Sequence, residues 1–288
     1  MNRRTQAYCL CIILLALVVL PMQDWNALAG MTREHVAGVA ALVFLGAIFE
    51  VLAVHASVGG HQSSSSISFL PFFASVLLFP PAAAVLGVAA TSFPTQIFVH
   101  KKPLLRACFN SSQAVIAIAV AVQVFESLGG VHAVPLSDNI ATFTGVVSFA
   151  GLAVTFFAVN QILVSIGIAF LTGNRVSTIV SRVAAPSGAN LLYDVLVSPI
   201  AVVVALLFSS YQLGGLVMVC LPLMIIRHSY VSILRLQQAN KDLLTVLVKT
   251  IETRDPYTSG HSIRVSILAR AIAEDMDLPA SRIDQVEM

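Results

Sequence analysis

The chain has 288 residues, of which 57% are hydrophobic and only 10% are charged, and its net charge is +2. Soluble domains carry about 25% charged residues, so this composition excludes an ordinary soluble protein and predicts an integral membrane protein. The small net charge gives no indication that a nucleic acid polymer is a partner. Charged residues are sparse up to Ile226 and frequent after it. We therefore expect a membrane domain over residues 1–226, in contact with the lipid bilayer, followed by a cytosolic part.

Apolar stretches in this first part predict eight membrane-spanning helices. Ile67–Phe98 is too long for one span of about 20 residues, and Pro80-Pro81 interrupts it, so it predicts a hairpin of two short helices. Ala141–Thr172 fits either one tilted helix or a span continued by an interfacial segment. Ala56–Ser66 is interpreted as a polar connection between the second span and this hairpin. The remaining spans are Ala7–Leu20, Val36–His55, Ser112–Leu128, Leu191–Phe208, which a short turn at Ser209–Gln212 follows, and Leu213–Ile226.

Lysine and arginine residues fall on one side of this arrangement. Cytosolic loops of membrane proteins are enriched in these residues. With the N-terminus in the cytosol, eight crossings leave only Arg33 outside. The sequence therefore predicts a multi-pass protein with both termini in the cytosol. The residues that share the cytosolic face are Arg3, Arg4, Lys101, Lys102, Arg106, Arg175, Arg182 and Arg227.

Three polar residues lie within or at the end of predicted spans, where burying them costs most: Glu50, Asn160 and Gln161. Such residues often mark functional sites in membrane proteins, so they are candidates for a sensor site. Glu50 lies near the end of its span, and a side chain reaching to the membrane surface is an alternative for it.

Residues 227–248 predict a helical linker that leaves the bilayer. Apolar residues recur there at steps of three and four, with polar residues between them. Such a stripe suits either plain packing or a parallel coiled coil, and the second would make the chain a homodimer. The stripe consists of Ile233, Leu236, Leu243, Leu244, Leu247 and Ile251.

A dense polar motif, RDPYTSGHSIRV, follows at residues 254–265. Pro256 lacks a backbone donor and disfavours helix at the residue before it, so the linker helix should end here. Gly260 permits a tight turn, and Thr258 or Ser259 can cap the next helix.

On that next helix, residues spaced by three and four share a face. One face carries His261, Arg264, Val265 and Leu268. The opposite face carries Ile263, Ile267 and Ala271, which we expect to be packing residues.

The run KTIETRDPYTSGHSIRVSILARAIAEDMDL, residues 249–278, closely resembles the opening of HD-GYP domains. These are bacterial metal-dependent phosphohydrolases of the HD superfamily that hydrolyse cyclic di-GMP. The resemblance implies that His261 is the first ligand of a site for divalent metal ions, iron or manganese. The family's His-Asp dyad and GYP segment would lie beyond Met288, so this chain alone should be inactive.

Two neighbours of His261 have roles that stay open. Arg264 either steadies the metal site or a phosphate, or forms a salt bridge with an acid such as Asp255. Asp255 is interpreted as structural support, accepting backbone N–H bonds in the turn.

Together these features predict an all-α protein. A polytopic helical membrane domain, sensory or anchoring, leads through a helical linker into residues 249–288, the first helices of an HD-type domain. We expect a signalling protein of the bacterial inner membrane whose full-length form acts on a cyclic dinucleotide. The alternatives are an HD hydrolase for another nucleotide or phosphate ester, and a membrane receptor or transporter with a regulatory tail.

Overall fold

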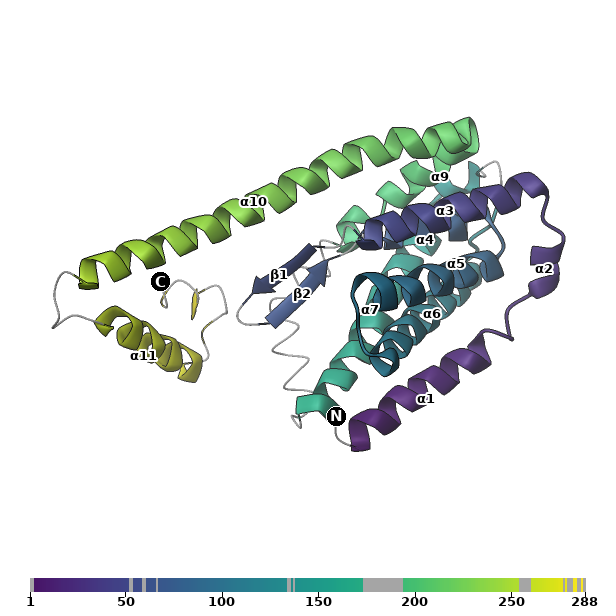
Figure 1. The fold of residues 1–288 in the computed structure, drawn as a ribbon. Helices are drawn as coiled ribbons and strands as arrows, with labels where there is room; N and C mark the ends of the chain where they lie inside the picture. The colour runs from purple at the N-terminus through teal and green to yellow at the C-terminus, as the bar shows by residue number, and fades with distance from the viewer. Residues whose placement is uncertain are drawn as a thin grey trace. The chain divides into compact units, whose positions relative to one another are not determined.

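The computed structural model describes residues 3–51, 54–58, 61–65, 67–133, 136, 138–172, 194–253, 260–276, 278, 282–283 and 286. As the sequence predicted, the protein is helical (Figure 1). The chain divides into two compact units. One contains Met1–Ala53 and Ser66–Cys220, and the other contains Val54–Ser65 and Leu221–Met288.

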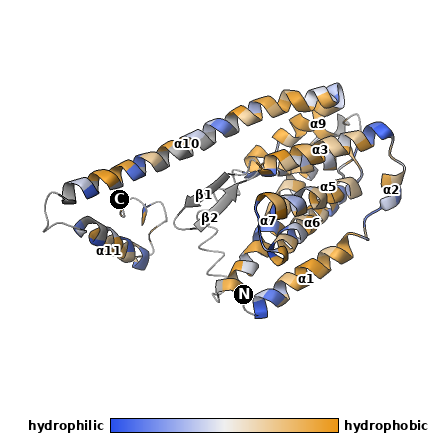
Figure 2. Cartoon of the chain, viewed as in Figure 1, coloured by the Kyte–Doolittle hydropathy of each residue, from blue (hydrophilic) through white to orange (hydrophobic). Residues whose placement is uncertain are grey.

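The first unit is a bundle of apolar helices, which Figure 2 colours predominantly as hydrophobic. By length and composition, five spans in the described ranges can cross a membrane: Arg33–Val51, Pro81–Val99, Leu104–Ser127, Phe143–Leu171 and Asp194–Tyr211. The elements of this unit are α1 (Arg3–Val19), α2 (Trp25–Ala29), α3 (Arg33–Val51), α4 (Phe69–Leu78), α5 (Pro81–Pro94), the π-helix η1 (Thr95–Val99), α6 (Leu104–Ser127), the 3-10 helix η2 (Asp138–Ala141), α7 (Phe143–Thr172), α9 (Ile200–Tyr211) and the beginning of α10 (Leu213–Thr253).

Helix α4 is the core of this bundle, because all ten of its residues are buried. It packs against α3, α5 and α9. Its Phe73 ring meets those of Phe149, Phe156 and Phe157 on α7 edge to face, at centroid distances of 6.2, 5.2 and 5.9 Å. Edge-to-face pairs are a favoured aromatic geometry. A helix that is apolar on every side is stable only when it is surrounded, and α4 meets that condition.

The break at Pro80-Pro81 is where the sequence predicted it. Helix α4 ends at Leu78, and α5 begins with Pro81 in its first turn, a position where proline's missing N–H costs nothing. The π-helix η1, directly after Pro94, was not predicted.

Several other boundaries differ from the prediction. Helix α6 begins at Leu104, eight residues before the predicted Ser112, because Pro103 at its N-cap starts the helix there. The stretch Phe143–Thr172 is one helix, which decides between the two interpretations left open. Helix α9 continues to Tyr211, so the predicted turn at Ser209–Gln212 narrows to Gln212, whose φ is 54°.

The polar connection after the second span contains an antiparallel strand pair, which was not foreseen. Helix α3 ends at Val51, and strands β1 (Val54–Val58) and β2 (His61–Ser65) follow, with Val58 opposite His61. The predicted span therefore reached four residues too far along the chain.

Helix α10 is continuous from the last apolar stretch through Arg227 to Thr253, with Pro222 inside it. Figure 2 shows its colouring change from hydrophobic to mixed along its length. It ends shortly before Pro256, as predicted.

Helix α11 (His261–Asp275) begins after Gly260, as predicted, but its cap differs. The N-cap is Gly260 itself, in the left-handed conformation at φ 68° and with no side-chain cap bond. Thr258 and Ser259 lie outside the described residues. The packing expected of Ile267 and Ala271 has no partner element among the described residues. The Ile267 side chain is 61% exposed and Ala271 is exposed, because no described element covers them.

Gly38 shows how closely the bundle is packed. A Cβ on Gly38 of α3 would lie 2.5 Å from Cζ of Phe208 and 2.8 Å from Cζ of Phe79. Both phenylalanines are buried, and their rings are 5.9 Å apart. Small residues that let helices approach closely are typical of membrane helix contacts.

We expect Gly38→Ala to lower the free energy of unfolding by about 1–3 kcal/mol, the usual cost of overpacking a filled core. The matched control is Gly214→Ala, because a Cβ on Gly214 meets nothing within 4 Å. Thermal unfolding in detergent measures both. Equal effects of the two substitutions would contradict the close packing at Gly38.

Candidate functional site

Glu50 lies near the end of α3 and is held there by polar groups from neighbouring segments. Its Oε2 accepts a hydrogen bond of 2.9 Å from the hydroxyl of Ser68, directly before α4. Its Oε1 accepts a longer bond of 3.5 Å from Nε2 of Gln96 on η1. The Glu50 side chain is only 18% exposed. A carboxylate this buried needs such donors, so Glu50 belongs to an internal site.

Two further residues complete this group. The side-chain amide of Asn110, on α6, donates to Oε1 of Gln96 at 3.0 Å. Nε2 of His100 lies 3.8 Å from Oε1 of Glu50, and the His100 side chain is 9% exposed. We call Glu50, Ser68, Gln96, His100 and Asn110 the Glu50 cluster. It joins α3, α4, η1 and α6 at one place.

The wide winding of η1 belongs to this site. The N–H groups of His100 and Lys102 donate to the carbonyls of Thr95 and Gln96, each at 3.0 Å. Single π turns inside α-helices are frequent at functional sites. Here the π turn places Gln96 beside Glu50 and Asn110, and a short loop follows it.

Lys102 in that loop is electrostatically coupled to the cluster. Burial lowers the pKa of its ammonium group, the Glu50 carboxylate opposes that shift, and the neighbouring Arg106 adds to it. Glu50 therefore faces a basic loop as well as neutral donors.

Asn160, on α7, belongs to a second polar group, whose other member lies about one turn further along α6 than Asn110. Its Oδ1 accepts a 3.3 Å hydrogen bond from Nε2 of Gln113. Asn110 and Gln113 are three residues apart on α6 and so lie on neighbouring positions of one face. Oε1 of Gln113 is buried and has no hydrogen-bond partner among the described residues. We call Gln113 and Asn160 the amide pair.

The Glu50 cluster and the amide pair together form what we call the polar seam, which runs from α3 to α7 through α6. Of the three residues that the sequence singled out, Glu50 and Asn160 lie at the two ends of the polar seam. Gln161 is partly buried on α7 and is not hydrogen-bonded to the seam in the described structure. The sequence prediction missed Gln96, His100, Asn110 and Gln113. Polar residues in or beside apolar spans were the signal that marks them.

A separate polar contact lies after the C-terminal end of α6. Nδ1 of His132 meets the carbonyl of Val76 at the end of α4, and its Nε2 lies 3.3 Å from Oε1 of Glu126. Both ring nitrogens face oxygen acceptors, so both contacts are hydrogen bonds only when the ring carries two protons. A hollow of about 10 Å³, lined by Phe125 and Ser148 among others, lies beside this loop. It is smaller than usual ligand pockets of about 300–1,000 Å³.

In the second unit, His261 and Arg264 lie exposed on the first turn of α11. A Cβ on Gly260 would lie 3.2 Å from Nη1 of Arg264, so the guanidinium lies close over the glycine. Asp255 is outside the described residues. Within the ranges described, no three histidine, cysteine, aspartate or glutamate side chains gather closely enough to hold a metal ion.

We expect Glu50→Leu to destabilise the bundle by about 1–3 kcal/mol, because the buried donors of Ser68 and Gln96 lose their acceptor. Glu50→Gln keeps one acceptor oxygen and should cost less. Thermal unfolding in detergent distinguishes them, with Gln123→Leu as the control. Gln123 is exposed, and among the described residues its hydrogen bond is to Glu126 on its own helix. If the Glu50→Leu protein is as stable as the control, the Glu50 cluster does not stabilise the bundle.

The comparisons with known proteins agree with a sensory membrane unit. The model of one family, MASE9, a membrane-associated sensor domain of signalling proteins, matches residues 28–254, from before α3 through the end of α10. No match to an HD-GYP domain is found. No curated protein and no solved structure matches the chain. The multi-pass helical chain therefore belongs to the MASE9 family of membrane-associated sensor domains.

Proposed function

We propose that this chain is the sensory and connecting part of a cyclic di-GMP phosphodiesterase of the HD-GYP type. The observation that supports this most directly is the RDPYTSGHSIRV segment, which follows the end of α10 and leads into α11. Its glycine, Gly260, has the left-handed backbone that favours glycine, and its histidine, His261, is exposed on the first helical turn. Helix α10 joins this segment to the sensor domain without interruption.

His261 is suited to be one ligand of a divalent metal site. A neutral imidazole coordinates iron or manganese, and the exposed position leaves room for ligands from other segments. Such ions, when bound, activate water and neutralise phosphate charge. In the hydrolysis itself, a water oxygen bonds to phosphorus, the bond from phosphorus to one ribose oxygen breaks, and that oxygen leaves with a proton.

Arg264 supports the same site in this proposal. It lies one turn after His261, and its planar fork fits two phosphate or carboxylate oxygens at once. Its place beside Gly260 keeps it near the start of α11. Asp255 is the proposed structural partner in the preceding turn.

The polar seam is the proposed sensing element of the membrane unit. It includes side chains on or beside α3, α4, η1, α6 and α7. Within it, Gln96 links Glu50 to Asn110 through hydrogen bonds, so a change at Glu50 alters the pairing of Asn110. The arginine and lysine distribution supports placement in a bacterial inner membrane with both termini in the cytosol. The loop around His132 would then face outward.

The second half of α10 carries a pattern that suits a parallel two-stranded coiled coil. Six exposed residues occupy the alternating a and d positions of a heptad repeat: Ile233, Leu236, Asn240, Leu243, Leu247 and Thr250. They extend over about 26 Å at 1.5 Å per residue. A single asparagine at an a position fixes register and favours pairing of two identical strands. Two copies in one membrane insert in the same direction, so their α10 helices leave it parallel.

Introduced cysteines test both the dimer and the topology, after the four native cysteines are replaced. We expect Leu243→Cys to form disulfide-linked dimers, because d positions face each other across the pair, while Thr245→Cys at an outward f position should not. Val131→Cys should react with an impermeant thiol reagent in intact cells, and Thr245→Cys should not. Equal cross-linking at 243 and 245 would reject the coiled coil. Labelling at 245 but not at 131 would reverse the topology.

The catalytic proposal is tested in a protein in which this chain continues into the rest of an HD-GYP domain. We expect His261→Ala to lose bound metal and to reduce cyclic di-GMP hydrolysis by more than about 100-fold, the upper end of what loss of an outer-shell partner costs. His228→Ala, which removes an exposed histidine from α10, is the control.

Metal content, protein abundance and rate are measured on the same samples. A His261→Ala protein that keeps its metal and its rate would show that the histidine is not a ligand. Hydrolysis of another nucleotide or phosphate ester in preference to cyclic di-GMP would place the enzyme elsewhere in the HD superfamily.

A further inference from the structure

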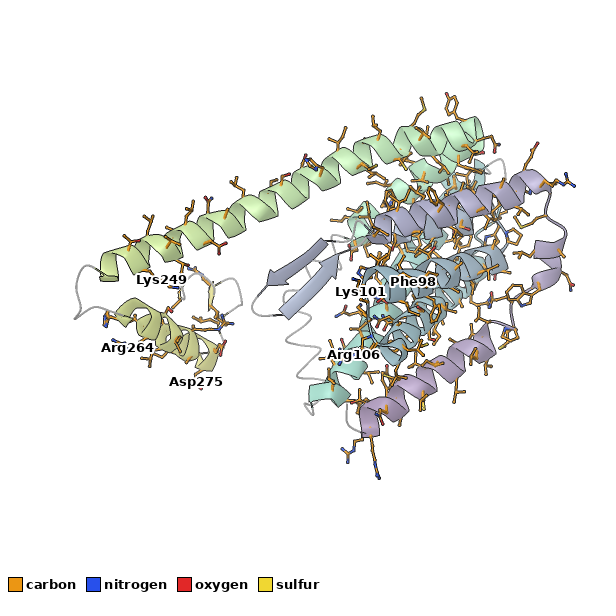
Figure 3. The ribbon with its side chains drawn as sticks, viewed as in Figure 1. Phe98, Lys101, Arg106, Lys249, Arg264 and Asp275 are labelled. Carbon is orange, nitrogen blue, oxygen red and sulfur yellow. The ribbon has the colours of Figure 1, made fainter. Side chains whose placement is uncertain are left out.

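The loop between η1 and α6 lies at the shared end of two membrane-spanning helices, Pro81–Val99 and Leu104–Ser127. It exposes large apolar side chains beside cations. Phe98 is 77% exposed and Leu104 is 65% exposed. Lys101 and Arg106 are exposed as well, and Figure 3 labels Phe98, Lys101 and Arg106. At the end of a span, aromatic and basic side chains lie at the level of the lipid headgroups.

Lys101 has a backbone conformation that would cost glycine less conformational free energy than it costs lysine. Its φ is 49°, in the left-handed region that costs a side-chain-bearing residue stability and that glycine adopts freely. The hydrogen bonds from the N–H groups of His100 and Lys102, on either side of it, hold this conformation. A lysine at a strained backbone position points to a use for its side chain.

The charge near this loop is predominantly positive. Lys101, Lys102 and Arg106 lie within six consecutive residues. Arg106 also lies near enough to Cys9 of α1 to influence it electrostatically. The acid that couples to Lys102 is Glu50, and its oxygens already accept hydrogen bonds from Ser68 and Gln96. Glu50 is thus engaged inside the bundle, and the exposed cations remain available to an anion from outside.

We propose that the loop from Phe98 to Arg106 binds the headgroup of an anionic phospholipid. The Lys101 ammonium and the Arg106 guanidinium contact the phosphate, since a point charge and a planar fork together suit its oxygens. Phe98 and Leu104 contact the first part of the acyl chains. The ligand is a lipid rather than a soluble anion because exposed apolar side chains flank the cations at the membrane surface.

The Glu50 cluster connects to this site through the chain itself. His100 belongs to the cluster, Lys101 follows it, and Lys102 is coupled to Glu50. A lipid bound to Lys101 therefore lies one residue from His100 of the polar seam. Whether the lipid is bound then affects the hydrogen bonds of the Glu50 cluster.

The test uses the purified chain in lipid nanodiscs of phosphatidylcholine alone or with part of it replaced by phosphatidylglycerol. We expect the anionic lipid to raise the midpoint of thermal unfolding of the wild-type protein. Retention of phosphatidylglycerol in native mass spectrometry should weaken about fivefold for each cation removed. The two variants are Lys101→Gly and Arg106→Gln. Lys101→Gly relieves the backbone strain, so in phosphatidylcholine it should be at least as stable as wild type.

The control is Arg33→Gln, which removes an exposed cation from the start of α3. It should keep both the stabilisation and the lipid retention. If Arg33→Gln loses as much as the two loop variants, the effect is general membrane electrostatics and the site is rejected. If inorganic phosphate stabilises the wild-type chain as well as the lipid does, the ligand is a soluble anion and the lipid proposal is wrong.

Discussion

The complete burial of α4 is the constraint on which the membrane unit depends. Lipid is as apolar as leucine, so apolar character alone does not hold one helix inside a bundle, and close packing must do so. The phenylalanine rings of α7 and the close approach at Gly38 provide that packing. Both ends of α4 then meet polar groups: Ser68 donates to Glu50 before its start, and the N–H of Ala133 donates to the Leu77 carbonyl at its end, at 3.0 Å. The proline pair that stops α4 leaves such carbonyls without helical partners, and the loop after α6 supplies donors.

Helix α6 has a different task in the same bundle. It packs against α1, α5 and α7, and its polar positions Asn110 and Gln113 reach Gln96 on one side and Asn160 on the other. Each of these hydrogen bonds joins segments that are distant in sequence. Deep among apolar helices such bonds are few and hard to replace, so they restrict how the helices shift against one another. A sensor domain needs helices with a few discrete arrangements, because coupling between two sites requires such elements.

Local rules predicted the features that depend on nearby residues. Pro80-Pro81 divided a long apolar stretch, Pro256 marked the end of α10, and Gly260 marked the turn before α11, because proline and glycine act through their own backbone. Glu50 and Asn160 stood out as polar residues in or at the end of apolar spans. Their partners did not, because the pairing of Gln96 with Glu50 depends on tertiary contact and on a π turn that no local pattern announces. Helical periodicity likewise shows that Ile267 and Ala271 share a face, but not which element covers that face.

Pro222 has a mechanical consequence for signalling. It lies inside α10, two residues after the boundary between the two compact units, and it removes one backbone hydrogen bond from the helix there. The 32 residues from Pro222 to Thr253 form a rod of about 46 Å at a rise of 1.5 Å per residue. A bend of about 20° at the proline, the size of an ordinary kink, would displace the tip of that rod by about 16 Å. Small angular changes at Pro222 would thus become large displacements at the far end of α10.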